Sequence, residues 1–500
     1  MDAVSKRRRA GWWAAVGLIA VAGLALRIVA ARGGLWTDEA WSVIYAAQAR
    51  DWVGVFLRIN HDNNHHLYSL WLQAIGPDAS PLLARAPAIV AGALAVPLAA
   101  IFAGRRSLAA GIVAALLFAF APALVVFGSE ARGYSMMLLA AMLMLLVVDD
   151  AVGGRESRAA PWLLAGIALF GMLSHMTMAA PVGIAALWFY LERRGQAGPD
   201  RAIRDAVRTM GPALLITAAV PVFVFVAASL SPTGMRIGGY EPFALGHYTA
   251  ALDDLALWSA GFSSPWPWLV PMLIGALALF IALRPPEWLG SRARLYALLI
   301  LTVPVGLGAA RAGNTEFARY YLASALGLLL LMAEWVATGF SGKGSARAGA
   351  VAIVAALLAV SGYRDSLLIA ADRGRPAAPV ADMAALQPAG ARIAFAGPRL
   401  KGVVAVAAER SGYPARFAGG CAPADFLLAA QSRWAATPAT VDRCGVTMDA
   451  IDSSVTIPLT GDSWVLYRAK RLQSLEAADS GPAPGARNRR LSGRAGVAQG

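Results

Sequence analysis

The sequence is dominated by apolar stretches long enough to cross a lipid bilayer. Several run for roughly 17 to 22 residues with almost no charge, about the length that a helix needs to span the hydrocarbon core. Of the 500 residues, 58% are hydrophobic and only 15% are charged, and a water-soluble protein does not bury that much apolar surface. This pattern predicts a polytopic α-helical membrane protein with about eleven transmembrane helices. We expect them at 12–31, 82–104, 108–127, 131–148, 160–175, 177–191, 210–230, 266–283, 295–310, 318–338 and 347–362, the fifth and sixth being short and divided at His175.

The basic residues predict the orientation of the chain. The first apolar stretch follows "SKRRR" and has no small-residue cleavage site, so we expect it to remain as a membrane anchor. The net charge of +14 is concentrated in the short loops on the amino-terminal side, as expected of a cytoplasmic side. This asymmetry explains the charge without a nucleic-acid partner. These loop residues are Lys6, Arg7, Arg8, Arg9, Arg105, Arg106, Arg155, Arg158, Arg193, Arg194, Arg201, Arg204, Arg208, Arg284, Arg292, Arg294, Lys343 and Arg347.

An odd number of crossings places the segment after the transmembrane module (1–362) on the outer side. Residues 363–475 contain short strand-like and helical patterns and predict a small extracytoplasmic α/β domain. The expected strands are "ARIAFAG", "SSVTIPLT" and "SWVLYRA", and the expected helix is "VVAVAAERSG". Cys421 and Cys444, both in this segment, are expected to pair in an oxidising compartment, a free pair being the alternative. Residues 476–500, rich in Pro, Gly and Arg, are expected to be disordered.

The polar residues of the membrane part gather on the predicted outer side. The loops on the opposite side offer basic residues and a few acids without a recognisable site. A catalytic or binding site is therefore expected to face outward. The outer residues are Asp38, Glu39, the stretch 60–71, Glu130, Arg132, His175, Arg236, Tyr240, Glu241, His247, Arg311, Glu316, Arg319 and Tyr320.

The first outer loop, 32–81, begins with two adjacent carboxylates. "TDEAWSVIYAAQARDWVGVFLRI" has helical periodicity with aromatic residues on one face, so we expect helices lying along the membrane surface. Thr37 is predicted to be an N-cap, with Asp38 and Glu39 in the first turn, where the helix dipole favours acids. The functional alternative is that carboxylates so close to the membrane serve chemistry.

A polar cluster follows in the same loop. "HDNNHH" lies between apolar anchors and contributes His61, Asp62, Asn64, His65 and His66. Its imidazole and amide groups suit hydrogen bonding to a hydroxyl-rich ligand. His61 and His65 also have the i, i+4 spacing of a metal-ligand pair, so a divalent metal is the alternative interpretation.

Two outward helix starts each carry an arginine. "SEARGY" contains Glu130, Arg132 and Tyr134, with Ser129 as the expected N-cap, and "FARYYLAS" contains Arg319 and Tyr320. A helix amino terminus with an arginine beside it predicts an anion site. The alternative is a pair of interfacial arginines with neighbouring tyrosines, which needs no ligand.

Taken together, these motifs resemble the GT-C superfamily of integral-membrane glycosyltransferases. The resemblance rests on the "DE" pair after the first helix, on "NHHLYSLW", on "SEARGYSMMLL" and on "RYYLASALGLLLL". It is closest to bacterial protein O-mannosyltransferase-like and lipid A glycosyltransferases and covers roughly residues 10–340. The chain departs from the family pattern in having "NHHL" without prolines.

The resemblance implies a polyprenyl-phosphate-sugar donor and an acceptor hydroxyl on an envelope glycan, lipid or protein, at the outer face of a bacterial inner membrane. Asp38 would accept the hydroxyl proton, and Glu39, the second catalytic acid, would hold Asp38 or a sugar hydroxyl. Arg132 and Arg319 would neutralise the phosphate leaving group. The remaining residues of the polar cluster would orient the sugar or the acceptor, and Glu130, Tyr134 and Tyr320 would help to bind the donor. No cofactor is expected, apart from the divalent metal of the alternative interpretation.

Three other functions remain open from the sequence. A lipid-linked polysaccharide polymerase would also face outward, and the sizeable loop 231–265 is compatible with one. A transporter or flippase would carry ionisable residues or broken helices near mid-membrane, but Arg27 is the main charge inside a predicted span. A scaffold that binds through its outer domain is the non-catalytic alternative.

Overall fold

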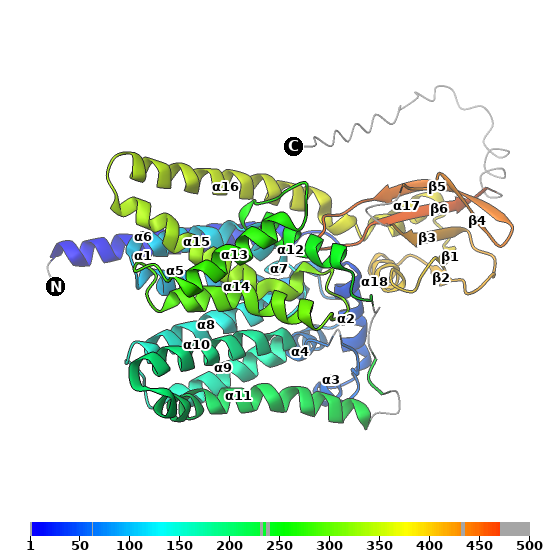
Figure 1. The fold of residues 1–500 in the computed structure, drawn as a ribbon. Helices are drawn as coiled ribbons and strands as arrows, with labels where there is room; N and C mark the ends of the chain where they lie inside the picture. Colours follow the sequence, from blue (N-terminus) through cyan, green and yellow to red (C-terminus); the bar gives the residue numbers. More distant parts are fainter. Residues whose placement is uncertain (1–2, 63, 231–233, 237–240, 432–435, 471–500) are drawn as a thin grey trace.

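The protein consists of a bundle of long helices and a small sheet domain at one end of it (Figure 1). The structure is a computed structural model that describes residues 3–62, 64–230, 234–236, 241–431 and 436–470. The expected disorder of 476–500, together with Asn63 and Tyr240, lies outside the described residues.

A helix coincides with each of the eleven predicted spans. The stretch 108–127 is divided into two helices, because Pro122 lacks the N–H and restricts the preceding residue, Ala121, to extended backbone. The bundle helices are α1 (Ala3–Ala30), α5 (Pro81–Gly104), α6 (Leu108–Phe120), α7 (Pro122–Phe127), α8 (Tyr134–Val152), α9 (Ala160–Ser174), α10 (Ala179–Ala197), α11 (Pro199–Ser229), α13 (Leu269–Leu283), α14 (Arg292–Ala309), α15 (Leu322–Ser341) and α16 (Ser345–Ala371).

Seven of these described segments are long and apolar enough to cross a membrane, and three shorter apolar helices, α6, α9 and α13, pack beside them. The chain is thus a polytopic helical membrane protein, as predicted. The helix that begins at Ser345 continues past the expected boundary at residue 362, since α16 ends at Ala371.

The end of the bundle remote from the sheet domain contains an ion-pair network that the sequence did not suggest. Arg292 donates to Glu334 at 2.6 Å and to Asp149 at 2.9 Å, and Arg105 donates to Asp149 at 2.7 Å. These contacts join α8, α14, α15 and the C-cap residue of α5. The network therefore ties four helices together.

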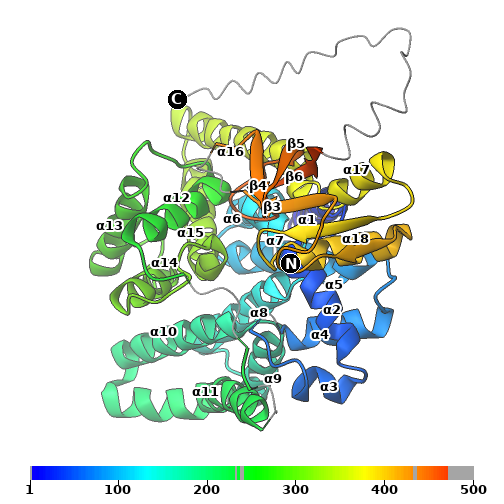
Figure 2. The same ribbon diagram turned by 90° about the vertical axis from the view of Figure 1, so that its right-hand side faces the viewer.

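Short helices cover the opposite end of the bundle. They are α2 (Thr37–Gln48), α3 (Trp52–Leu57), α4 (His66–Ile75), α12 (Leu245–Ala260) and the 3₁₀ turns η1 (Met176–Met178) and η2 (Ala318–Tyr321). In the end view of Figure 2, the sheet domain lies over one part of this end and leaves α8 to α11 uncovered.

The sheet domain confirms the expected α/β class. It begins after η3 (Asp372–Gly374), and its six strands have the order β2-β1-β3-β6-β5-β4. β1 pairs in parallel with β2 and β3, and the remaining pairs are antiparallel. The elements are α17 (Ala378–Leu386), β1 (Ala391–Phe395), α18 (Lys401–Ser411), β2 (Ala415–Phe417), β3 (Phe426–Ala430), β4 (Thr440–Arg443), β5 (Val446–Ser454) and β6 (Trp464–Ala469).

Three details of the domain bear on the sequence predictions. The predicted helix ends at Gly412, which has a left-handed φ of 68°, and Cys421 and Cys444 form the predicted disulfide. The expected strand "SSVTIPLT" is wrong over most of its length, because β5 ends at Ser454 and the following residues form a loop. That loop turns back toward the membrane part, as described below.

The sheet domain and the first outer loop share one hydrophobic core. Leu35 and Tyr68 of the membrane part are buried in the same cluster as Val404 and Trp464 of the sheet domain. Burial of apolar surface of this kind is the main force holding the two parts in contact. The sheet domain is therefore docked on α2 and α4 and can position residues there.

Candidate active site

A cavity of about 890 Å³ opens at the outer end of the bundle; we call it the outer cleft. Ten of the residues predicted to form a site line this cleft. They are Asp38, His61, Asp62, Asn64, His65, His66, Arg132, Tyr134, Arg319 and Tyr320. Two predicted residues, Glu39 and Glu130, do not line it.

Asp38 lies between two arginines in the cleft. Oδ2 of its carboxylate pairs with Arg132 and lies 3.2 Å from Nη1 of Arg319. The three side chains come from α2, from the α7–α8 loop and from η2. Folding thus brings together one carboxylate and two cations that the sequence separates by more than 90 residues.

The arginines also control the charge of Asp38. Burial acts to raise its pKa, but the positive charges of Arg132, Arg319 and Arg399 outweigh burial and hold the pKa below its ordinary value. Asp38 is therefore ionised at neutral pH. A ligand that draws the arginines toward itself would make Asp38 a stronger base, because the cations stabilising its charged form would be shared.

Three aromatic rings line the wall beside Arg132. The rings of His65 and His175 stack with centroids 4.7 Å apart, and those of Tyr134 and His175 lie 4.1 Å apart. The Arg132 guanidinium lies 5.0 Å from the Tyr134 ring centre and donates through Nε to Nε2 of His65 at 3.3 Å. Burial first, and then neighbouring positive charge, hold the pKa values of His65 and His175 well below their ordinary range. Both imidazoles are therefore neutral at physiological pH, and the arginines supply the cations of this wall.

The remaining residues of the "HDNNHH" cluster lie along the same loop. His61 Nδ1 is 2.7 Å from Oδ1 of Asp62, and His66 stacks on Phe56 with centroids 5.2 Å apart. Burial lowers the pKa of His66 to about 4. The Asn64 amide donates to the carbonyls of Val55 and Ile59, so it shapes the loop and has less capacity for the expected ligand contact.

The His61–His65 pair does not form a metal-ligand group within the described part of the chain. His61 contacts Asp62, whereas His65 directs Nε2 toward Arg132. Among the described residues, no three or more His, Cys, Asp or Glu side chains are grouped so that they could hold a metal ion.

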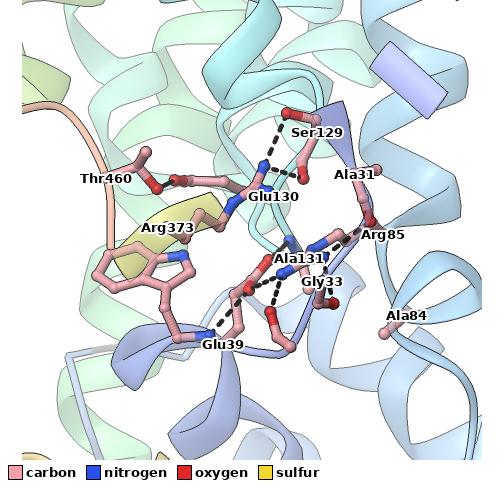
Figure 3. A network of polar contacts seen from close by, with 12 residues as sticks. Ala31, Gly33, Glu39, Ala84, Arg85, Ser129, Glu130, Ala131, Arg373 and Thr460 are labelled. Carbon is pink, nitrogen blue, oxygen red and sulfur yellow. Dashed lines mark hydrogen bonds and ion pairs between the residues drawn. The ribbon is translucent and has the colours of Figure 1, made fainter. Parts of the chain in front are cut away.

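Glu39 differs from its neighbour Asp38 in every structural respect. Its side chain is fully buried, and Arg85 grips it in a fork, with Nε at 2.8 Å from Oε1 and Nη2 at 2.5 Å from Oε2. The backbone N–H of Ala131 donates to Oε1 at 2.6 Å, and that of Trp36 donates to Oε2 at 3.3 Å. Figure 3 shows this network. With its acceptors occupied, Glu39 positions α2 and has no access to a substrate, in contrast to the expected catalytic role.

Glu130 belongs to the same buried network (Figure 3). Its Oε1 accepts a hydrogen bond from the Thr460 hydroxyl, which comes from the loop between β5 and β6. Burial raises the pKa of Glu130 to about 7, against the opposing charge of Arg373. Glu130 therefore joins the membrane part to the sheet domain. It does not line the cleft, so the expected contact with a ligand there is not supported.

Neither Thr37 nor Ser129 occupies the N-cap position predicted for it. α2 begins at Thr37 itself, and the backbone N–H of Thr37 donates to Oδ2 of Asp462 at 2.8 Å. α8 begins at Tyr134, so Ser129 precedes it by several residues, and the Ser129 hydroxyl accepts from Arg373 at 2.8 Å. The sheet domain thus provides the cap that places the first turn of α2, and with it Asp38.

Apolar side chains form another wall of the cleft. Phe56 of α3 and Val224 and Ala228 of α11 line it. Beyond them, α11 exposes large apolar side chains, with Val222 61% and Phe225 68% exposed. Exposed apolar surface on a membrane helix is the surface that faces lipid, so the cleft adjoins a lipid-facing side of the bundle.

Several cleft residues were not among the predicted site residues. Trp41 and Tyr45 were recognised only as part of an aromatic face, and Asn314, Phe317 and Arg399 were not identified. Arg399 belongs to the sheet domain, and nothing in its local sequence signals that it approaches α2. His175 was marked only as an outer residue and as the division between two spans.

Similarity to known proteins is found among solved structures. No family model matches the chain, and no curated protein matches it. Among solved structures, the chain is similar to ArnT from Cupriavidus metallidurans bound to undecaprenyl phosphate, with 16% sequence identity and a TM-score of 0.46, over 90% of this chain and 97% of that one.

Proposed function

We propose that this membrane protein is a glycosyltransferase of the GT-C type, which moves a sugar from a polyprenyl-phosphate carrier to an acceptor hydroxyl on an envelope glycan, lipid or protein. The observation that carries the proposal is the position of Asp38 between Arg132 and Arg319 in a large cleft beside exposed apolar surface. One carboxylate for a proton and two cations for a phosphate are the groups that this transfer requires.

The donor suits the two contrasting walls of the cleft. Its phosphate would lie on Arg132 and Arg319, and its polyprenyl chain would leave along the apolar wall of α3 and α11 toward lipid. The neutral rings of His65, Tyr134 and His175 offer flat apolar surfaces and hydrogen-bonding edges for the sugar. This arrangement supports a lipid-linked donor over a free nucleotide sugar.

The reaction follows from these positions. Asp38 accepts the proton of the acceptor hydroxyl while the hydroxyl oxygen forms a bond to the anomeric carbon. The bond from that carbon to the phosphate oxygen breaks, and its electron pair remains on the phosphate. The two arginines stabilise the charge that develops there. No step of this scheme requires a metal ion.

We further propose that the cleft and the sheet domain face away from the cytoplasm of a bacterial inner membrane. Supporting this orientation, the basic loops lie at the opposite end of the bundle and a disulfide lies in the sheet domain. A polyprenyl-linked sugar would then be used on the side where envelope acceptors are found.

The proposal is tested by mass spectrometry of envelope lipids and glycans from cells that lack the protein and carry a plasmid copy. The native copy should restore a species heavier by one sugar unit, and Asp38→Asn should not. Arg311→Ala, an exposed arginine outside the cleft lining, is the matched control and should restore it. Full restoration by Asp38→Asn at equal expression would refute the proposed transfer.

A further inference from the structure

Arg399 is the third arginine of the outer cleft, and it comes from the sheet domain. It lies in the loop between β1 and α18, beside Pro398, which also lines the cleft. Its positive charge acts on Asp38: burial raises the pKa of that carboxyl, and Arg399, with Arg132 and Arg319, lowers it.

The main chain around Arg399 is fixed against α2. The Trp41 indole donates through Nε1 to the Arg399 carbonyl at 3.0 Å. Gly402 follows in such close contact that an added Cβ would lie 2.8 Å from the Trp41 ring. Trp41 in turn stacks on Tyr45 with centroids 5.6 Å apart. The loop thus holds an exposed, long side chain at the cleft.

The three arginines differ in what they already contact. Arg132 and Arg319 both pair with Asp38. Among the described residues, the Arg399 guanidinium makes no hydrogen bond or ion pair. Arg399 is therefore available to an anionic ligand without giving up a contact.

The proposed reaction changes the charge that the arginines face. The donor is a phosphodiester with one negative charge, and the released carrier is a phosphomonoester with close to two at a pH above its second pKa of about 6. Once Asp38 has lost its proton to solvent, Arg132 and Arg319 together balance Asp38 and only one of the two phosphate charges. A third cation is needed for the other.

We propose that Arg399 binds the phosphate of the carrier after the sugar has left, so that the sheet domain completes the leaving-group site. This inference rests on the proposed function. In this role Arg399 favours binding of a phosphomonoester over a phosphodiester, whereas Arg132 and Arg319 bind both.

The test uses the purified full-length protein in detergent at pH 8, with farnesyl phosphate as the monoester and its methyl ester as the diester. Arg399→Ala should weaken monoester binding by about five- to tenfold, as expected for loss of one charge-assisted contact at an exposed site. It should change diester binding by less than about twofold. Lys401→Ala, which removes a neighbouring charge that lies over Phe417 outside the cleft lining, should change neither.

Separate outcomes distinguish this inference from the proposed function. Equal weakening of both ligands in Arg399→Ala, or no weakening of either, overturns the selective role of Arg399. If the native protein binds neither ligand, or if Arg132→Ala binds both normally, the proposed function itself fails. Unchanged monoester binding with a raised requirement for acceptor in turnover assays would assign Arg399 to the acceptor and also overturn the inference.

Discussion

The carboxylate of Asp38 lies 3.2 Å from the guanidinium of Arg319, although the two residues belong to opposite ends of the membrane part of the chain. Glu39, the next residue, points from a different face of α2, where it is buried in an ion pair with Arg85. Adjacent residues of a helix point about 100° apart, so two neighbouring acids rarely share one environment. This division separates a carboxylate available for chemistry from one that holds the structure.

Asp38→Asn and Glu39→Gln are therefore expected to fail in different ways. Asp38→Asn should retain the fold and lower the rate of sugar transfer by roughly two to four orders of magnitude, because the proton acceptor is lost. Glu39→Gln leaves Arg85 buried and unpaired, which should cost about 3–5 kcal/mol of stability. Thermal unfolding and turnover of both variants check this assignment. A stable, slow Glu39→Gln protein beside an active Asp38→Asn would reverse it.

Arg132 and Arg319 are expected to set the donor requirement. Replacing either with alanine should weaken donor binding and slow turnover, at a cost of about 1.5–3 kcal/mol for each charge-assisted hydrogen bond lost. Lysine should restore only part of this, because it lacks the planar fork of donors. Initial rates at varied donor concentration measure the effect. Arg311→Ala serves as the control, and native kinetics in both alanine variants would argue against a phosphate site.

Glu130 predicts a pH dependence of stability. Its pKa is raised to about 7 by burial, so the folded state favours the neutral carboxyl. The contribution of neutral Glu130 to the free energy of unfolding is complete below the ordinary pKa of a glutamate. It is lost as the pH rises through about 7. The native protein should therefore lose up to roughly 3 kcal/mol relative to Glu130→Gln between pH 5 and pH 8. Parallel unfolding temperatures of the two proteins across this range would contradict the prediction.

Asp462 is expected to transmit the position of the sheet domain to α2. Asp462→Ala removes the acceptor for the Thr37 N–H, and loss of a helix cap costs about 0.5–2 kcal/mol. The same change should lower turnover, since the first turn of α2 carries Asp38. Unfolding and rate measurements on Asp462→Ala are compared with Glu409→Ala, an exposed acid of the same domain. An unchanged rate would show that α2 is placed without this contact.

The proposed orientation is tested by thiol labelling of intact spheroplasts. In a chain with Cys421 and Cys444 replaced by serine, Arg416→Cys in β2 should react with a membrane-impermeant maleimide. Arg347→Cys, at the start of α16, should react only after the membrane is opened. Both positions are exposed. The reverse pattern would place the cleft and the sheet domain in the cytoplasm.

The sequence by itself determined the class of the protein, because hydrophobic length and charge asymmetry are local properties of the chain. It predicted a helix at each of eleven places and the α/β class of the sheet domain. It also placed Asp38, Arg132 and Arg319 on one side, because residues at the same ends of antiparallel helices must lie at the same end of a bundle. The disulfide was predictable because the chain has only two cysteines.

Only the tertiary structure decided which of those residues contact one another. Asp38 and Glu39 are equivalent in sequence, and they are distinguished by Arg85, 46 residues from Glu39. The cap of α2 comes from Asp462, 425 residues away, and Arg399 reaches the cleft because the sheet domain shares a core with α2 and α4. The physical reason is that a buried charge or an open helix end must be satisfied by whichever group packing brings near, and packing is settled by contacts between distant parts of the chain.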